Sequence, residues 1–154
     1  MTDLFDELSR IVAALNKEEI PYALVGGLAY SVWVEARNTE DIDLLIRPED
    51  WPRVASVLNP MGFETLAGPM EFEKVRLRRL TKIKGEDVVV LDFILADGNL
   101  GSGLDGSVRV TYRGEEYSVS TPEVLIALKR NRMSPKDRND IEGLQKIIDQ
   151  GGEQ

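Results

Sequence analysis

The sequence predicts an α+β fold in which helices flank a mixed β-sheet and a pair of helices lies near the C-terminus. Three observations support this prediction. Apolar residues recur at helical spacing near both ends of the chain, short apolar runs of strand length lie between them, and turn residues separate the runs. The 154 residues also fit one domain, with a core over about 20–96 and a C-terminal hairpin and helices over 108–149.

The first part of the chain alternates between predicted helices and strands. Residues 3–17 carry apolar side chains at helical spacing, which predicts an amphipathic helix that Pro21 ends. Residues 22–25 form a short apolar run typical of a buried strand. Three further elements are predicted before residue 60: a short helix over 28–35, a strand over 41–46 and a helix over 48–58.

The second part is predicted to contain mainly strands, followed by helices. Residues 63–66 form an expected short strand, and 71–80 and 87–95 two long strands joined by a hairpin at Lys84-Gly85-Glu86. We expect the Gly-rich segment 96–107 to be a flexible surface loop. The remaining elements are a hairpin of strands at 108–112 and 117–120, a helix from Pro122 to about Asn131, and a last helix that begins at Ser134-Pro135.

The composition limits the chemistry that the chain can perform. It contains neither cysteine nor histidine, which excludes disulfides, thiolate metal sites and imidazole catalysis. Any catalysis must therefore use carboxylates, Lys, Arg, Tyr, Ser or Thr. A bound metal would have oxygen ligands, which suit Mg²⁺, Mn²⁺ or Ca²⁺.

The charge and hydropathy of the chain indicate its class of partners. A net charge of −8 argues against a broad nucleic-acid groove. Residues 74–84 and 129–138 are locally basic, which leaves room for a local RNA contact, although solvated surfaces explain either run equally well. No apolar run approaches 18 residues and the N-terminus is acidic, so we expect no membrane span, no signal peptide and a cytoplasmic location.

Two aspartates lie in a predicted strand whose other residues are apolar. Asp41 and Asp43 are at positions i and i+2, so their side chains lie on one face with Cα atoms roughly 6.5–7 Å apart. Two carboxylates this close are unfavourable unless a cation neutralises them or one is protonated. This pair therefore predicts a cation site.

Asp92 is the single polar residue in the run from Val88 to Leu95. An isolated charge buried in such a strand is very unfavourable, so the carboxylate needs a partner. A divalent ion shared with Asp41 and Asp43 is one explanation. An ion pair with an arginine, or a cap at the strand end, is the alternative.

Several other residues could contact a nucleotide. Gly26 and Gly27 lie between a strand and a helix, where glycine allows close approach to a phosphate and helix N–H groups point outward; a tight turn is the simpler explanation. Arg37, Thr39 and Lys129 are further phosphate-binding candidates, with a solvated loop and a surface lysine as alternatives. Asp140 is expected to be solvated. The GxGxxG pattern at 101–106 precedes a strand and is not a dinucleotide fingerprint.

The motifs Val25-Gly26-Gly27 and Asp41-Ile42-Asp43, followed by Asp92, resemble those of the nucleotidyltransferase superfamily of the DNA polymerase β type. The local sequence is most similar to small bacterial and archaeal members, namely minimal, abortive-infection-toxin-type and lincosamide-modifying nucleotidyltransferases. The resemblance spans about 22–141, including the helices around Lys129 and Asp140. Many members have Gly-Ser where this chain has Gly-Gly, so only backbone can contact phosphate there.

The resemblance implies a nucleotidyltransferase-like sheet and a metal-dependent reaction. Asp41 and Asp43 would bind two Mg²⁺ ions, with Mn²⁺ as an alternative, and Asp92 would hold the catalytic ion and assist deprotonation of the acceptor. The reaction would transfer a nucleoside monophosphate from an NTP to a hydroxyl of an RNA end, a protein or a small molecule such as an antibiotic. A toxin–antitoxin setting would add an antitoxin-like helical partner protein.

Two other functions fit the same residues. A DxD glycosyltransferase would use a nucleotide-sugar, but the short chain and the Gly-Gly turn count against it. A non-catalytic nucleotide-binding or interaction module would bind an NTP with Mg²⁺ and show no turnover.

Overall fold

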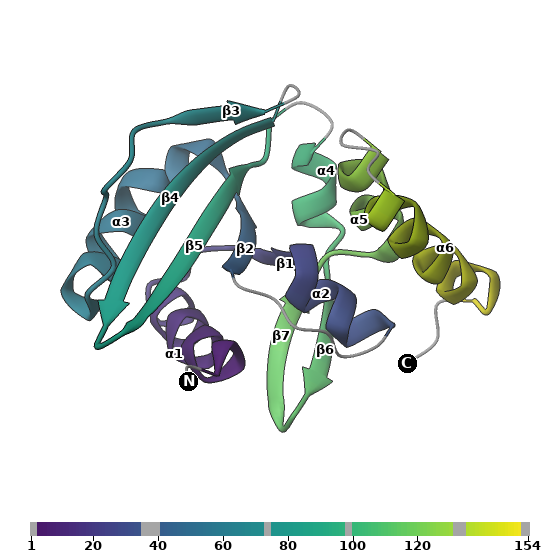
Figure 1. Ribbon diagram of the computed structural model, residues 1–154, viewed down its shortest axis with the longest axis horizontal. Coiled ribbons are helices and arrows are strands. Elements are labelled where there is room, and N and C mark those ends of the chain that lie inside the picture. Colours follow the sequence, from purple (N-terminus) through teal and green to yellow (C-terminus); the bar gives the residue numbers. More distant parts are fainter. Residues whose placement is uncertain (1–2, 35–40, 73–74, 98–99, 131–134, 152–154) are drawn as a thin grey trace.

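The computed structural model describes residues 3–34, 41–72, 75–97, 100–130 and 135–151. Seven strands in these ranges form one mixed sheet in the order β3-β4-β5-β2-β1-β7-β6, with helices on both faces (Figure 1). The predicted α+β class is therefore confirmed. Among the described helices, none is long and apolar enough to cross a membrane.

The elements have the following bounds. The strands are β1 (Ala23–Val25), β2 (Asp41–Ile46), β3 (Met70–Phe72), β4 (Val75–Lys84), β5 (Asp87–Leu95), β6 (Val108–Tyr112) and β7 (Glu115–Val119). The α-helices are α1 (Leu4–Lys17), α2 (Gly26–Trp33), α3 (Trp51–Leu58), α4 (Leu100–Asp105), α5 (Pro122–Arg130) and α6 (Pro135–Asp149). Short 3₁₀ turns, η1 (Pro48–Asp50) and η2 (Asn59–Met61), flank α3.

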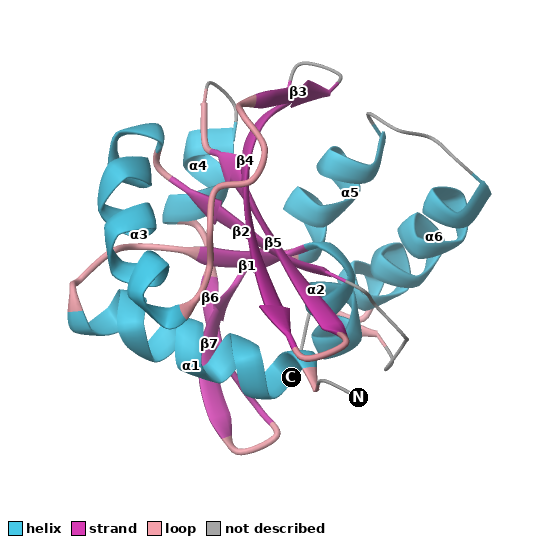
Figure 2. Ribbon diagram, turned by 60° about the vertical axis from the view of Figure 1, so that its left-hand side comes forward, coloured by secondary structure: helices cyan, strands magenta, loops and turns pink. Residues whose placement is uncertain are grey.

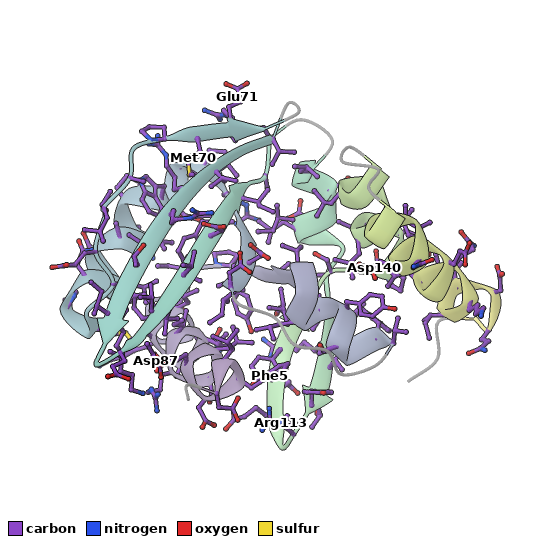
Figure 3. All side chains as sticks on the ribbon, in the orientation of Figure 1. Phe5, Met70, Glu71, Asp87, Arg113 and Asp140 are labelled. Atoms are coloured by element: carbon purple, nitrogen blue, oxygen red, sulfur yellow. The ribbon has the colours of Figure 1, made fainter. Side chains whose placement is uncertain are left out.

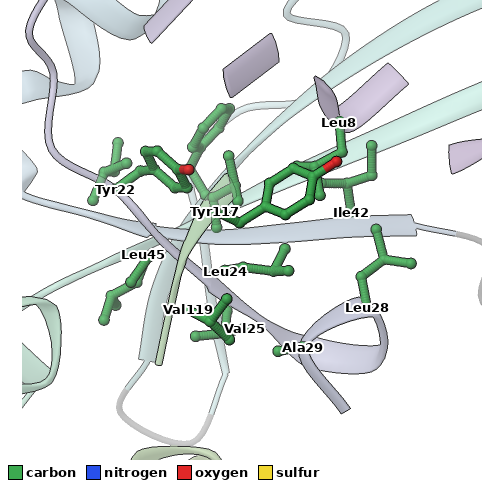
Figure 4. Packing of buried hydrophobic residues seen from close by; sticks show 14 of the residues in the cluster. Leu8, Tyr22, Leu24, Val25, Leu28, Ala29, Ile42, Leu45, Tyr117 and Val119 are labelled. Atoms are coloured by element: carbon green, nitrogen blue, oxygen red, sulfur yellow. The ribbon is translucent and has the colours of Figure 1, made fainter. Parts of the chain in front are cut away.

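One face of the sheet packs on α1 and α3, and the other meets α2 and the C-terminal helices (Figure 2). The middle of the first face is apolar: Phe93 of β5 packs on Trp51 of α3 with ring centroids 5.7 Å apart. Figure 4 shows Leu8 of α1 and Ile42 of β2 in the same core, and both side chains are fully buried. Burial of this apolar surface is the main driving force for the fold.

The second face is only partly covered. The helix α2 packs on β1 and β2, and α5 and α6 pack on α2. In Figure 1, β4 and β5 pass in front of α1 and α3, and no described helix lies over their near face. Ile83 and Val88, a cross-strand pair near the end of this hairpin, are 68% and 55% exposed. The border between the covered and open parts of this face runs beside β2 and β5.

The N-terminal helix also contacts the β6–β7 hairpin. Asp3 caps α1 by accepting a hydrogen bond from the Phe5 N–H at 2.9 Å. Arg113, at the hairpin tip, donates to Asp3 at 2.9 Å and lies over the Phe5 ring at 5.2 Å (Figure 3). These contacts link two segments that are far apart in sequence.

Three sequence predictions about secondary structure were wrong. The strand expected at 71–80 is two antiparallel strands, β3 and β4, with Met70 paired to Leu77. Residues 63–66 contribute only an isolated bridge between Glu64 and Thr81. The expected loop at 96–107 contains α4, whose Leu104 is buried and whose Gly103 passes close to Val124 and Leu45. Tertiary packing on this apolar surface explains a helix where glycine content alone predicts a loop.

Candidate active site

The strand register brings three aspartates together on the partly open face. Asp43 of β2 lies opposite Asp92 of β5 in a parallel ladder, and Asp41 lies two residues earlier on the same face. One carboxylate oxygen from each residue lies within 4.8 Å of the others. Asp92 is buried at 5% exposure, whereas Asp41 and Asp43 are partly exposed. The structure therefore groups the three predicted residues, while their roles remain predictions.

Arg79 is part of this cluster and was not among the residues predicted from the sequence. It lies opposite Asp92 in the antiparallel β4–β5 ladder. Its Nε donates to Asp92 Oδ1 at 2.7 Å, and its Nη2 donates to Oδ2 at 3.0 Å. This is a bidentate ion pair, the geometry in which an arginine holds a carboxylate most firmly. The structure is consistent with both explanations offered for Asp92. Its carboxylate is paired with an arginine, and it also lies beside the carboxylates of Asp41 and Asp43.

The electrostatics of Arg79 reflect the whole cluster. Hydrogen bonding to Asp92 raises the pKa of the Arg79 guanidinium, and the charges of Asp92, Asp41 and Asp43 add to this effect against the opposing effect of burial. One guanidinium can offset at most one of the three negative charges. Three carboxylates within 4.8 Å of one another favour the binding of a cation at this place.

Gly26 is required by the geometry of Asp43. Val25 pairs with Asp43 across β1 and β2, so the chain turns into α2 directly beside this aspartate. Gly26 has a φ of +73°, and a Cβ added to it would lie 2.2 Å from Asp43 Oδ2. Only glycine combines this backbone conformation with this closeness.

Gly26 and Gly27 form the start of α2, next to the carboxylates. The N-cap residue, Val25, makes no side-chain hydrogen bond to the first turn. First-turn N–H groups of a helix have no partner within the helix and favour anions. The predicted phosphate-binding residues therefore lie directly beside the predicted metal ligands.

The other predicted site residues are placed less completely. Arg37 and Thr39 lie outside the described residues. Lys129 belongs to α5, but its side chain is outside the described part. Asp140 was expected to be solvated, and this was wrong: it is 1% exposed on α6 (Figure 3). The signal that could have identified it is its place four residues before Leu144, because positions i and i+4 share a helix face and Leu144 is fully buried.

A separate hollow of about 550 Å³ lies at the opposite end of β1 and β2. Its lining includes Tyr22, Arg47 and Arg109, but none of the three aspartates. Arg47 is paired with Asp105, and Arg109 with Glu116. Because both guanidinium groups already have carboxylate partners, this hollow shows no specific feature for a ligand.

A nucleotidyltransferase family, described as uncharacterised, matches residues 2–136 of the sequence. The chain belongs to this family. The predicted membership of the nucleotidyltransferases is thereby confirmed, and the chain is an enzyme that transfers a nucleoside monophosphate. No curated protein sequence matches this nucleotidyltransferase significantly.

Solved structures share the fold of this nucleotidyltransferase. The lincosamide antibiotic adenylyltransferase LnuA, bound to lincomycin, is 17% identical, with a TM-score of 0.66 over 92% of this chain and 96% of its own. ANT(2")-Ia, in complex with adenylyl-2"-tobramycin, is 13% identical, with a TM-score of 0.62 over 96% and 90%. TM1012 from Thermotoga maritima, assigned as a nucleotidyltransferase, is 16% identical, with a TM-score of 0.63 over 96% and 93%. At these identities the similarity concerns the fold alone.

Proposed function

We propose that this nucleotidyltransferase transfers a nucleoside monophosphate from an NTP to a hydroxyl group of a small molecule, and that the reaction depends on Mg²⁺. The observation that carries the proposal is the convergence of Asp41, Asp43 and Asp92 in a chain of this family. Two proteins of the same fold were captured with lincomycin and with adenylylated tobramycin, which supports a small-molecule acceptor. The net charge of −8 disfavours a nucleic-acid acceptor.

The donor set fits a hard divalent cation. All three groups are carboxylates, which suit Mg²⁺ and Mn²⁺ better than they suit Zn²⁺ or Cu²⁺. Neighbouring ligand oxygens around an octahedral ion with bonds of about 2.1 Å are about 3 Å apart. The oxygens lie within 4.8 Å of one another, so small side-chain rotations would bring them to this spacing. When bound, such ions neutralise the phosphates and lower the pKa of the attacking hydroxyl.

Each predicted site residue would have a specific role in this reaction. Asp41 and Asp43 would hold both ions, and Asp92 would hold the catalytic ion and accept the proton of the acceptor hydroxyl. The N–H groups of Gly26 and Gly27 would bind the triphosphate, whose remaining charge would be met by Arg37, Thr39 and Lys129. The hydroxyl oxygen attacks the α-phosphorus, the bond to the β-phosphate oxygen breaks, and pyrophosphate leaves.

The proposal is tested by transfer of label from each of the four α-³²P-labelled NTPs, with Mg²⁺, to a panel of hydroxyl-bearing small molecules that includes lincomycin and tobramycin. We expect labelled product from the native chain and none from Asp43→Asn. Label transfer that Asp43→Asn leaves unchanged would contradict the assignment of the site.

Three further arms separate the other functions. The resemblance to toxin-type members keeps an RNA end or a protein as the second class of acceptor, in a cytoplasmic setting with an antitoxin-like helical partner. Total RNA and purified proteins, offered as acceptors, test this class. Labelled UDP-sugars are the negative control, because a member of a nucleotidyltransferase family should not transfer their sugar.

A further inference from the structure

Arg79 and Asp92 form a contact that the reaction itself does not explain. Arg79 comes from β4, a strand that carries none of the three aspartates. Both of its hydrogen bonds go to the carboxylate that would hold the catalytic ion. The side chain of Asp92 is 8% exposed, so this pair is largely shielded from water on the aspartate side.

The geometry of the pair limits how Asp92 can move. A planar guanidinium that bonds both carboxylate oxygens sets the position and the tilt of the carboxylate. Each oxygen has two lone pairs, and Arg79 uses one on each. The remaining lone pairs are available to a cation, and an oxygen of Asp92 lies within 4.8 Å of oxygens on Asp41 and Asp43. Arg79 therefore holds Asp92 in the position of a ligand before any ion arrives.

The charge of the pair has a second consequence. A guanidinium on Asp92 partly neutralises the carboxylate cluster, and the charges of Asp41 and Asp43 also act on it. A positive charge about 5 Å from a divalent ion in a water-like dielectric weakens ion binding roughly tenfold. Arg79 should thus stabilise the cluster without metal and lower its affinity for metal.

We propose that Arg79 is the built-in counter-ion of the carboxylate cluster and lowers the affinity of the site for divalent cations. This inference rests on the proposed function, because it takes the three aspartates as the metal ligands. It assigns Arg79 a role in the binding of the ion, in addition to any role in the stability of the sheet.

The test measures Mn²⁺ binding to the full chain by electron paramagnetic resonance of free Mn²⁺. We expect Arg79→Met to bind Mn²⁺ about tenfold more tightly than the native chain. Arg79→Lys keeps the charge and should restore the native affinity to within about twofold. Arg79→Gln keeps a hydrogen-bonding side chain and removes the charge, so it should bind as tightly as Arg79→Met and serves if the methionine variant does not fold.

Arg78→Met is the matched control. Arg78 is the adjacent residue of β4, and strand alternation places it on the opposite face, where its guanidinium lies 5.9 Å from the centre of the Trp51 ring. This variant removes the same charge from the same strand, and we expect its Mn²⁺ affinity to stay within about twofold of native. A similar change in both variants would mean that overall charge is responsible and would overturn the proposal.

The remaining outcomes separate this proposal from the proposed function. Unchanged or weaker Mn²⁺ binding by Arg79→Met and Arg79→Gln overturns the counter-ion role, while loss of Mn²⁺ binding in Asp43→Asn still supports the metal site. A purely structural Arg79 would lower the melting temperature equally with and without Mn²⁺. Absence of Mn²⁺ binding in both the native chain and the Arg79 variants would overturn both proposals.

Discussion

The strand β4 contributes to two charged clusters on opposite faces of the sheet, and their charge balance is reversed. On the face of α1, Glu7 is 1% exposed and receives three cations: Arg10 at 2.6 Å, Lys82 at 3.2 Å and Lys84 at 3.5 Å. On the other face, three aspartates share the neighbourhood of Arg79. In the first cluster, the single carboxylate is surrounded by cations of the same chain. In the second, three carboxylates lie within 4.8 Å of one another, an arrangement that a bound cation would stabilise.

This difference suggests how a buried acid can be classified from its surroundings. Burial alone would raise the pKa of Glu7, but hydrogen bonds from Arg10 and Lys82 hold it below the ordinary value. Such a carboxylate ties α1 to β4 and contributes to stability. Carboxylates gathered within a few ångströms repel one another when no ligand is bound and favour the binding of a cation, which is a common compromise at functional sites.

The largest expected effect comes from Asp43→Asn. Under the proposed function this change removes a metal ligand and should reduce turnover by at least about a thousandfold, or about 4 kcal/mol in the barrier. The folded chain should remain at least as stable without metal, because one of the like charges is gone. Label transfer from NTP measures the first effect, and thermal unfolding in EDTA measures the second. A substantial drop in the melting temperature in EDTA would show that Asp43 is needed for the fold and would break the comparison.

Glu7→Gln should have the opposite effects to Asp43→Asn: it should lower stability and leave metal binding unchanged. The change leaves three cations without their shared carboxylate and should destabilise the chain by about 2 kcal/mol, near the low end for buried pairs because Arg10 and Lys84 are half exposed. A fall of roughly 4–8 °C in the melting temperature is expected for a chain of this size. Mn²⁺ affinity should be native. A Glu7→Gln variant with weakened Mn²⁺ binding would show that the two clusters are coupled.

Gly26→Ala should affect both stability and the site, by a smaller amount. Its positive φ makes alanine unfavourable by about 1 kcal/mol, and the new Cβ would displace the carboxylate of Asp43. Gly85→Ala is the matched control, because Gly85 has a φ of +63° and no atom lies within 4 Å of an added Cβ. We expect both variants to lose stability and only Gly26→Ala to bind Mn²⁺ more weakly. Equal Mn²⁺ affinities of the two variants would show that displacement of the Asp43 carboxylate does not weaken Mn²⁺ binding.

The smallest expected effect is the loss of the stability contributed by Glu7 at acidic pH. The folded pKa of Glu7 lies below its ordinary value of 4.5, so the unfolded chain binds the proton more tightly. The contribution of Glu7 to stability is therefore fully present above about pH 4.5 and is lost as the pH falls through the lower folded pKa. Chemical denaturation of the native chain and Glu7→Gln should show a stability difference that is constant from pH 7 to 5 and narrows below. A difference that widens in acid would reverse the sign of the shift.

Much of the candidate site could be predicted because it depends on local geometry. Asp41 and Asp43 share a face through the two-residue repeat of a strand, and glycine before a helix allows unusual backbone angles. Arg79 could not be identified in the same way. It is one of several cations in the run 74–84, and only the register of β4 against β5 places it opposite Asp92. Gly26 was predicted for phosphate contact, whereas its closeness to Asp43 emerges only from the pairing of β1 with β2.

The sequence by itself determined the α+β class and, through the lack of Cys and His, the restriction of any metal site to oxygen ligands. It also identified the three aspartates as candidate site residues. Only the tertiary structure decided that β3 and β4 are separate strands, that α4 replaces a loop, that Asp140 is buried, and that Asp92 is held by Arg79. The physical reason is the separation along the chain of the residues that determine each feature. Periodicity and composition act over a few residues, whereas the partner of a buried charge depends on strand register and helix packing across the whole chain.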